Sequence, residues 1–383
     1  MNDCVIVAYG RSAVARAGRG SLARVHPVDL GAEVLRGVLA RIPELDPSGI
    51  DDLLVGCAIP EAAMGLNPAR NIVLRAGLPF AVAGQTVNRF CASGLQAVAT
   101  GAALIRAGMA EVVVAGGVEH MSTPVLSDAP EHRNDHLAQH TDAYLAMGLT
   151  AEHVARRYHI ARPDMDRLAV DSHARAQVAR LGGAFTDQIV PVTGMRPDGQ
   201  RFVLTEDECV RPGTSLEALA ALRPAFAPGG LVTAGTSSPR SDGAAFLVLM
   251  STARARLLGV PALARVAGYA VAGVDPRYMG IGPVAAVPKV LRQTDLGLAD
   301  LDVIELNEAF AAQVIAVLRD LGIDWAGVNR RGGALALGHP LGATGAVLAC
   351  SAIAQLHAGG GTHALVTMCV GGGMGAAGVL ERL

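Results

Sequence analysis

An order of helix and strand occurs twice in this chain, and this duplication constrains the fold more than any other feature of the sequence. Residues 29–57 combine an amphipathic helix, an acidic turn and an apolar strand. Residues 283–306 repeat this order, so that Asp52 and Asp302 lie at equivalent places with an offset of 250 residues. The chain is therefore predicted to consist of two related halves.

The duplication continues in the next elements of each half. In residues 87–116 a strand ends in a tight glycine turn, a helix of small residues follows, and a second strand closes the unit. Residues 332–371 have the same order, in which GGALALGHPLGATG is followed by a helix and a strand, and a longer loop between these two, AGGGTH, absorbs the extra length. Alternating strands and helices predict right-handed crossovers and a mostly parallel sheet in each half, with helices on both faces. The helices at 96–108 and 346–359 are rich in alanine and glycine, which favours a central helix layer shared by the two sheets.

The segment between the halves breaks this pattern. Residues 120–238 are more polar, carry most of the histidines, and have helical spacing at 150–158 and 163–181. We expect an inserted domain that lies over the active face, after which the strand at 243–250 completes the first half. The predicted division is residues 1–119 with 239–268 for the N-terminal half, residues 120–238 for the inserted domain, and residues 269–383 for the C-terminal half.

Charge and hydropathy exclude several classes of partner. The chain carries 32 basic and 34 acidic residues, spread without a basic stripe, so neither nucleic acid nor a membrane is an expected partner. The apolar run near the N-terminus is too short for a signal sequence, and no later run reaches about 18 residues. We therefore expect a soluble, cytoplasmic protein that acts on small molecules or binds other proteins.

The cysteines and histidines do not form a metal-binding pattern. The six cysteines include no C-x-x-C pair, and their spacing suits neither a disulfide framework nor a zinc site. The regularly spaced His132, His136 and His140 are interpreted as a solvated helix face. No metal site is expected, and each cysteine has to be judged from its own neighbours.

One cysteine lies where a strand gives way to a helix. Cys91, in VNRFCASGLQ, precedes a helix that begins near Ser93. The positive end of the helix and its free backbone N–H groups favour a thiolate, the form of cysteine that attacks a carbonyl carbon. A buried core cysteine is the alternative interpretation.

Two further segments carry groups suited to the same chemistry. His339 lies in the glycine-rich turn GGALALGHPLGATGA, at the place equivalent to Cys91, where an imidazole can take a thiol proton or stabilise an oxyanion. Cys369 ends the last apolar strand in HALVTMCVGGGMGAA, where three glycines expose backbone N–H groups as an oxyanion hole. A second thiol can move a proton at the carbon next to a thioester. For both residues the alternative is a structural role.

A strand-to-helix junction in ELNEAFAAQ supplies an amide and a carboxylate. The amide of Asn307 is suited to hold a water at a reaction centre. Glu308 is either an acid–base group or a structural residue of the first helical turn.

Together these segments resemble the thiolase family. VNRFCASGLQ, NEAFAAQ, GGALALGHPLGATGA and CVGGGMG occur in the family's order and spacing. AGGVEHMSTP, MGLTAEHVA, LRPAF, VTAGTSSPRSDGAA and GVDPRYMGIGP are similar to further thiolase segments, so the resemblance covers nearly the whole chain. It implies the thiolase fold: an α/β protein of two duplicated βαβαβ-type halves in five layers, α-β-α-β-α, with an inserted loop domain.

The resemblance also implies a mechanism. Cys91 is the acylated nucleophile and His339 its base, while Cys369 is the acid and base at the α-carbon of the substrate. His339 and a water held by Asn307 form one oxyanion hole, and the backbone N–H groups of Cys91 and Gly371 form the other. An acyl group then passes by a ping-pong mechanism between a 3-ketoacyl-CoA, acetyl-CoA and CoA.

The resemblance implies coenzyme A as a substrate and no permanently bound cofactor. Five residues are expected, by match to family positions, to line the tunnel for its pantetheine arm: Met147, Phe226, Ser238, Met279 and Phe310. A homodimer or homotetramer is expected, and the resemblance leaves room for a partner subunit of fatty-acid oxidation.

Two positions depart from the family pattern. Arg331 stands where family members commonly have a small polar residue, and it either shifts the loop of His339 or points outward. Ala146 stands where many biosynthetic acetoacetyl-CoA thiolases have histidine, which favours the degradative 3-ketoacyl-CoA branch, an acetyl-CoA C-acyltransferase. The alternatives are an acetyl-CoA C-acetyltransferase that makes acetoacetyl-CoA, an acyltransferase with a non-CoA acceptor, and a thiolase-like scaffold subunit without activity.

Overall fold

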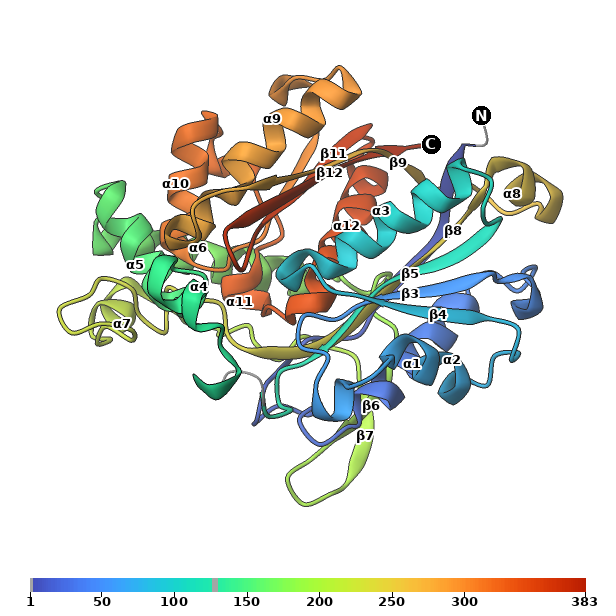
Figure 1. Cartoon of the computed structure of the whole chain (residues 1–383), viewed down its shortest axis with the longest axis horizontal. Helices are drawn as coiled ribbons and strands as arrows, with labels where there is room; N and C mark the ends of the chain where they lie inside the picture. Colours follow the sequence, from blue (N-terminus) through green and yellow to red (C-terminus); the bar gives the residue numbers. More distant parts are fainter. Residues whose placement is uncertain (1–2, 126–129) are drawn as a thin grey trace.

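The computed structural model describes residues 3–125 and 130–383 (Figure 1). The elements of its N-terminal half are β1 (Cys4–Arg11), β2 (Ala15–Arg16), α1 (Pro27–Leu39), β3 (Asp52–Gly56), α2 (Pro68–Ala76), β4 (Ala83–Val87), α3 (Ser93–Arg106), β5 (Val112–His120), β8 (Ser241–Ser251) and α8 (Thr252–Leu258). The strand order is β4-β3-β5-β8-β1, and β2 pairs with β8. The strands β1, β3, β4 and β5 run in one direction, and β8 runs antiparallel between β5 and β1.

The C-terminal half repeats this topology. Its elements are β9 (Ala264–Gly273), α9 (Gly282–Thr294), β10 (Val303–Leu306), α10 (Ala311–Leu321), α11 (Ala334–Leu337), α12 (Leu341–Gly359), β11 (His363–Val370) and β12 (Met374–Arg382). The order β10-β11-β12-β9 matches β3-β5-β8-β1, with β12 as the antiparallel strand. An isolated parallel bridge between Ile304 and Val328 takes the place of β4. The predicted duplication of mixed, mostly parallel sheets is confirmed.

The register of the repeat differs by one residue from the sequence prediction. Oδ2 of Asp302 accepts two backbone N–H groups where β11 begins, at 2.6 and 3.0 Å. Its counterpart is Asp51, whose Oδ2 accepts two N–H groups where β5 begins, at 2.7 and 3.0 Å. The pairing of Asp52 with Asp302 is therefore wrong, because Asp51 and Asp52 are adjacent carboxylates that the sequence pattern does not distinguish.

The elements stack in five layers (Figure 1). The helices α1 and α2 lie outside the N-terminal sheet, and α9 and α10 lie outside the C-terminal sheet. The sheets of the two halves are joined where β1 pairs antiparallel with β9. Between them lie α3 and α12, which share one apolar core with both halves of the sheet. The predicted α/β class, with a central helix layer, is confirmed.

The two central helices touch at glycines. A Cβ on Gly94 would lie 2.8 Å from the carbonyl oxygen of Gly342, and one on Gly345 would lie 2.4 Å from the backbone nitrogen of Leu95. Gly94 lies in α3, and Gly342 and Gly345 lie in α12, so the two helices can cross closely. The helix α12 begins at Leu341 and not at the predicted residue 346.

The helix α12 is also unusually apolar. Within the described residues it is long and apolar enough to cross a membrane, with a mean hydropathy of 1.4. The structure places it at the centre of the protein, where 72% of that window is buried. Its composition is therefore explained by the central helix layer.

The chain leaves the N-terminal sheet after β5 and returns to it at β8. The intervening elements are α4 (Asp135–His140), α5 (Met147–Arg157), α6 (Arg162–Leu181), β6 (Val192–Met195), β7 (Arg201–Leu204) and α7 (Leu216–Ala220). In this segment α5 and α6 pack against α10, and α6 also packs against α11. The carboxylate of Asp207 accepts two hydrogen bonds from the buried guanidinium of Arg11 in β1, at 2.7 and 2.8 Å. The division at residues 119, 238 and 268 stays a prediction, and its last boundary falls within β9.

Candidate active site

Cys91 lies in a short helical turn, Phe90–Ala92, between β4 and α3. Phe90 has a φ of 44°, a left-handed conformation that is rare outside glycine and often found at functional sites. The hydroxyl of Ser93 holds the turn, because it donates to the carbonyl of Phe90 at 2.6 Å and accepts the N–H of Arg89 at 2.8 Å. The side chain of Cys91 is 9% exposed, so the thiol is buried but not sealed.

Cys369 lies near the end of β11, which packs against the turn of Cys91, and Gly371 directly follows this strand. The backbone N–H groups of Gly371 and of Cys91 itself act to lower the pKa of the Cys91 thiol, which places both groups near its sulfur. Burial raises the pKa of Cys369, and a charge on Cys91 raises it further, so the two sulfurs lie close enough to interact. The sharp turn into β12 uses Gly372 and Gly373, with φ angles of 75° and 82°. The structure thus brings together the three residues predicted from two distant segments.

His339 lies two positions before α12 and is held from three sides. Its backbone N–H donates to the hydroxyl of Ser241 at 3.2 Å, and its Nδ1 lies 2.7 Å from Oγ1 of Thr344. Its Nε2 lies 3.2 Å from the amide nitrogen of Asn307. Burial lowers the pKa of His339 to about 4, so the imidazole is neutral near pH 7.

Asn307 links this histidine to the strand that carries Cys369. Its backbone N–H donates to the carbonyl of Thr367 on β11 at 2.9 Å. Its side-chain amide is buried, and Oδ1 accepts no hydrogen bond from the described residues. One buried acceptor is therefore left for a group outside the chain.

The repeat explains why Cys91 and His339 lie in one place. Each residue stands two positions before a central helix, Cys91 before α3 and His339 before α12. The first turns of these helices are in contact at Gly94 and Gly342, and α12 also packs against the turn of Cys91. The structure thus gathers all five predicted site residues where the two halves meet.

The resting state of the thiol differs from the sequence prediction. Burial raises the pKa of Cys91 to about 11, although the N–H groups of Gly371 and Cys91 act in the opposite direction. A thiolate favoured by the helix N-terminus is therefore wrong for the resting protein, because desolvation outweighs the backbone donors. Near pH 7, Cys91 is therefore a neutral thiol and His339 a neutral imidazole.

This neutral pair predicts a pH titration. We expect the ultraviolet absorbance of a thiolate, measured as the protein minus Cys91→Ser, to be absent at pH 7 and to rise as the pH approaches about 11. A raised pKa keeps the thiol protonated to higher pH, so the sign of the shift fixes the direction. A full thiolate signal already present at pH 7 would instead indicate a resting ion pair with His339.

The five residues predicted to contact coenzyme A lie near one another. The rings of Phe226 and Phe310 meet edge to face at 6.0 Å, and the backbone N–H of Ser238 donates to Ala309 at 3.0 Å. Met147 and Met279 pack into the apolar cluster that also contains Phe310 and Cys369. Phe226 is 40% exposed, so one end of this group lies at the protein surface.

The sequence left two roles open for Glu308, an acid–base role and a structural role, and the structure supports the structural one. Its buried carboxylate accepts hydrogen bonds from Ser172 at 2.6 Å, Asn329 at 2.8 Å and the N–H of Leu335 at 3.1 Å. All three donors lie in segments that pack around the chain leading to His339. Glu308 therefore fixes that chain.

Arg331 belongs to the same region. Its side chain is half-buried and donates to the carbonyl of Ala184 at 3.0 Å. Of the two interpretations, an outward orientation is thus wrong, because the guanidinium ties the loop before His339 to the segment that follows α6.

Two residues of the site region were missed by sequence reasoning. Glu119 is buried at the end of β5, and its carboxylate accepts the N–H groups of Ala58 at 2.7 Å and Gly342 at 2.8 Å. Thr344 contacts the ring of His339. Both residues lie in segments that the sequence analysis singled out, Glu119 in AGGVEHMSTP and Thr344 in GHPLGATGA. A motif does not show which groups its side chains contact.

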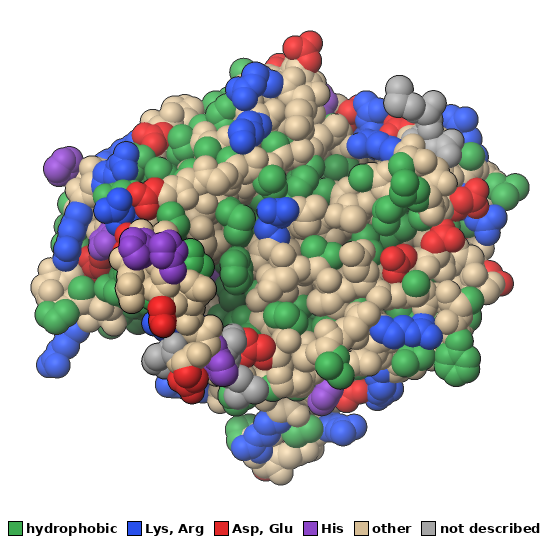
Figure 2. Space-filling model, viewed as in Figure 1, with side chains coloured by type: hydrophobic (Ala, Val, Ile, Leu, Met, Phe, Trp, Pro, Cys, Tyr) green, Lys and Arg blue, Asp and Glu red, His purple; other side chains and the backbone are tan. Residues whose placement is uncertain are grey.

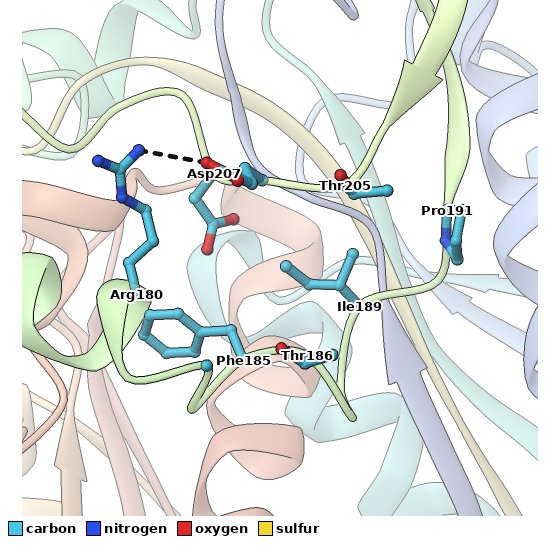
Figure 3. A pocket seen from close by; sticks show the side chains of 9 residues that line it. Arg180, Phe185, Thr186, Ile189, Pro191, Thr205 and Asp207 are labelled. Carbon is cyan, nitrogen blue, oxygen red and sulfur yellow. Dashed lines mark hydrogen bonds and ion pairs between the residues drawn. The ribbon is translucent and has the colours of Figure 1, made fainter.

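A separate pocket of about 280 Å³ lies on the segment between β5 and β8 (Figure 3). Arg180 pairs with Glu206 there at 3.4 Å. Its lining in the described chain includes none of the predicted site residues.

Histidines gather on the face formed by α4 and α5 (Figure 2). His136 and His140 are exposed and stack at 4.2 Å, as a solvated face predicts. Among residues 3–125 and 130–383, no group of three or more His, Cys, Asp or Glu side chains is arranged to hold a metal ion. The expectation of no metal site stays a prediction.

The geometry defines a two-half α/β protein with a cysteine and a histidine at the starts of its paired central helices. Models of the thiolase N-terminal and C-terminal domains match residues 4–253 and 260–382. The chain belongs to the thiolase family, and its function is that of a thiolase.

Relatives of known name support this assignment over the full length of the chain. A 3-ketoacyl-CoA thiolase of Bacillus subtilis (strain 168) is 47% identical, with 100% of both chains covered. An acetyl-CoA acetyltransferase of Escherichia coli (strain K12) is 44% identical, also with 100% of both covered. The crystal structure of the Bacillus anthracis acetyl-CoA acetyltransferase matches with a TM-score of 0.92 and 40% identity, covering 100% of this chain and 99% of that one.

Proposed function

We propose that this thiolase cleaves 3-ketoacyl-CoA with CoA, as an acetyl-CoA C-acyltransferase of fatty-acid degradation, through an acyl-Cys91 intermediate. The observation that carries the proposal is the meeting of Cys91, Cys369 and Gly371 with the His339–Asn307 pair at one contact between the halves. The names of several similar proteins, including the Bacillus subtilis relative, agree with this substrate class.

The first half-reaction breaks the carbon–carbon bond. His339 takes the proton of Cys91 as the sulfur attacks the 3-keto carbon, so that the thiolate exists only during the attack. The C2–C3 electron pair then leaves with the acetyl-CoA portion, and the thiol of Cys369 delivers a proton to C2. Acetyl-CoA departs, and the remaining acyl group stays on Cys91 as a thioester.

The second half-reaction returns Cys91 to its starting state. The thiolate of Cys369 takes the proton of an incoming CoA thiol, and the CoA sulfur attacks the acyl carbon. Cys91 leaves as the new acyl-CoA forms, and the proton borrowed by His339 returns to its sulfur. Atoms and charges balance without a redox partner or a metal ion.

Two groups of donors stabilise the negative oxygens of these steps. The backbone N–H groups of Cys91 and Gly371, which act on the pKa of the Cys91 thiol, serve the oxygen of an acyl group attached to that sulfur. The imidazole of His339 serves the other oxygen, together with a water on the unpartnered Oδ1 of Asn307.

Coenzyme A enters this scheme as a substrate, with no cofactor held permanently. Its pantetheine arm lies along Met147, Phe226, Ser238, Met279 and Phe310, whose apolar surface leads toward Cys369. The enzyme works as a homodimer or homotetramer in the cytoplasm, with room for a fatty-oxidation partner subunit.

The degradative direction rests on one side chain besides the relatives' names. Ala146 is exposed at the start of α5, directly before Met147, and contributes only a methyl group where many biosynthetic members have histidine. A smaller residue at the edge of the predicted tunnel leaves more space for a long acyl chain. The Escherichia coli relative, named acetyl-CoA acetyltransferase, keeps acetoacetyl-CoA synthesis as the second candidate.

Thiolysis rates across acyl chain lengths test the proposal. The purified protein is mixed with CoA and 3-ketoacyl-CoA substrates from the four-carbon acetoacetyl-CoA upward, and loss of the 3-keto thioester is followed. We expect kcat/KM for longer chains to equal or exceed that for acetoacetyl-CoA. Activity confined to acetoacetyl-CoA would favour the acetyltransferase, and absence of thiolysis on every substrate would favour a scaffold subunit.

A further inference from the structure

We infer that Thr344 is a positioning residue that holds the proton of His339 on Nδ1 and so keeps the lone pair of Nε2 free for the thiol proton. This inference rests on the proposed function, in which His339 is the base for Cys91. Thr344 itself touches neither substrate nor the reacting atoms. It acts through one contact, the 2.7 Å distance between its Oγ1 and Nδ1 of His339.

The hydroxyl proton of Thr344 is committed to another acceptor. Oγ1 donates to the carbonyl of Pro340 at 3.0 Å, one turn earlier in α12. The same carbonyl accepts the backbone N–H groups of Ala343 at 2.8 Å and Thr344 at 3.0 Å, which fixes its position in the first helical turn. A threonine hydroxyl has one proton, so toward His339 it can only accept.

The tautomer follows from the hydrogen bonds on both sides of the ring. With the proton on Nδ1, the ring donates to Thr344, Thr344 donates to Pro340, and the amide of Asn307 donates to Nε2. With the proton on Nε2, Thr344 must turn away from Pro340, and Asn307 must reverse its amide. The first arrangement keeps all three bonds in a site where His339 is 4% exposed and unmade bonds are costly.

This arrangement prepares His339 to act as the base in the first step of the reaction. Nε2 gives up the Asn307 donor when it accepts the thiol proton, and the resulting imidazolium keeps its Nδ1 bond to Thr344. Without the hydroxyl, a buried Nδ1–H loses its acceptor, and the tautomer with the proton on Nε2 cannot act as the base.

Matched variants separate this role from packing. Thr344→Val keeps the shape and removes the hydroxyl, and Thr344→Ser keeps the hydroxyl. Thr294→Val is the control, because Thr294 makes the same bond to a carbonyl one turn earlier, Val290 at 3.0 Å in α9, with no histidine on it. We expect acylation of Cys91 by acetyl-CoA to slow about 10-fold or more in Thr344→Val, and to stay within about 3-fold of wild type in Thr344→Ser and Thr294→Val.

A second measurement reads the tautomer directly and needs no activity. The protein is labelled with ¹⁵N-histidine, and the ring nitrogens of His339 are assigned by their loss in His339→Asn. We expect the wild type to show a protonated Nδ1 and an unprotonated Nε2 at pH 7, and Thr344→Val to lose this pattern. If the wild-type protein shows no acylation at all, the proposed function fails. The measured tautomer of His339 still tests the positioning role of Thr344 in that case.

Two results would overturn the inference. One is a proton on Nε2 in the wild-type resting protein. The other is acylation in Thr344→Val as fast as in Thr294→Val. If Thr344→Val does not fold, judged by its thermal unfolding, the wild-type spectrum and the rate of Thr344→Ser still decide, because loss of acylation in the serine variant contradicts a role for the hydroxyl.

Discussion

Cys91→Ser is expected to form no acyl-enzyme and to lower 3-ketoacyl-CoA thiolysis by about 10³-fold or more. A hydroxyl is much harder to deprotonate than a thiol, and a neutral imidazole whose pKa is lowered to about 4 is too weak a base to compensate. The acyl-enzyme is measured as the mass gained by the protein on incubation with acetyl-CoA, and thiolysis as the loss of the 3-keto thioester.

Cys4→Ala serves as the control for this substitution. Cys4 is a fully buried thiol at the start of β1, in a different part of the central core. It is expected to keep both the mass increase and the thiolysis rate. A mass increase that persists in Cys91→Ser, located by peptide mapping on another residue, would remove Cys91 as the nucleophile.

Cys369→Ala is expected to keep acylation of Cys91 by acetyl-CoA and to lose carbon–carbon bond cleavage by about 10²-fold or more. In acylation by acetyl-CoA, Cys369 only delivers a proton to the departing CoA sulfur, and this sulfur can also leave as a thiolate. The nucleophile, its base and the oxyanion donors therefore suffice for that step. Cleavage also needs a proton delivered to C2, and in this site Cys369 is the group placed for that transfer. The two steps are compared as mass gain with acetyl-CoA and as thiolysis of a 3-ketoacyl-CoA.

The matched control is Cys350→Ala, a fully buried cysteine within α12. It loses the same sulfur atom from the core and is expected to retain both activities. Equal loss of acylation and cleavage in Cys369→Ala, with Cys350→Ala intact, would reject the division of labour between the two thiols.

Much of the fold could be predicted because the same order of helices and strands occurs twice in the sequence. A single copy of helix, acidic turn and strand is ambiguous, whereas two copies in the same order define the equivalent elements and the shared helix layer. The predictions that were wrong concern details that depend on three-dimensional geometry. Asp51 and Asp52 are chemically alike, and only the register of β3 on β5 shows which carboxylate meets the backbone N–H groups.

The sequence predicted which residues make up the site, but it did not predict the contacts between them. Segments with Cys91, His339 and Cys369 could be singled out because strand-to-helix junctions and glycine turns expose reactive groups. The protonation state of Cys91 could not, since the sequence indicates the helix end but not the extent of burial that raises its pKa to about 11. Thr344 was missed because its importance lies in a 2.7 Å contact.

The glycine contact between α3 and α12 has a consequence for how the enzyme moves. Any hinge or sliding motion of one half against the other would separate Cys91 from His339, since each is carried by its own helix. The catalytic cycle must therefore run on a stationary base, without closure of the two halves. Opening for substrates of different length then falls to the parts of the segment between β5 and β8 that lie away from Ser172 and Ala184, because these two residues hold the chain leading to His339.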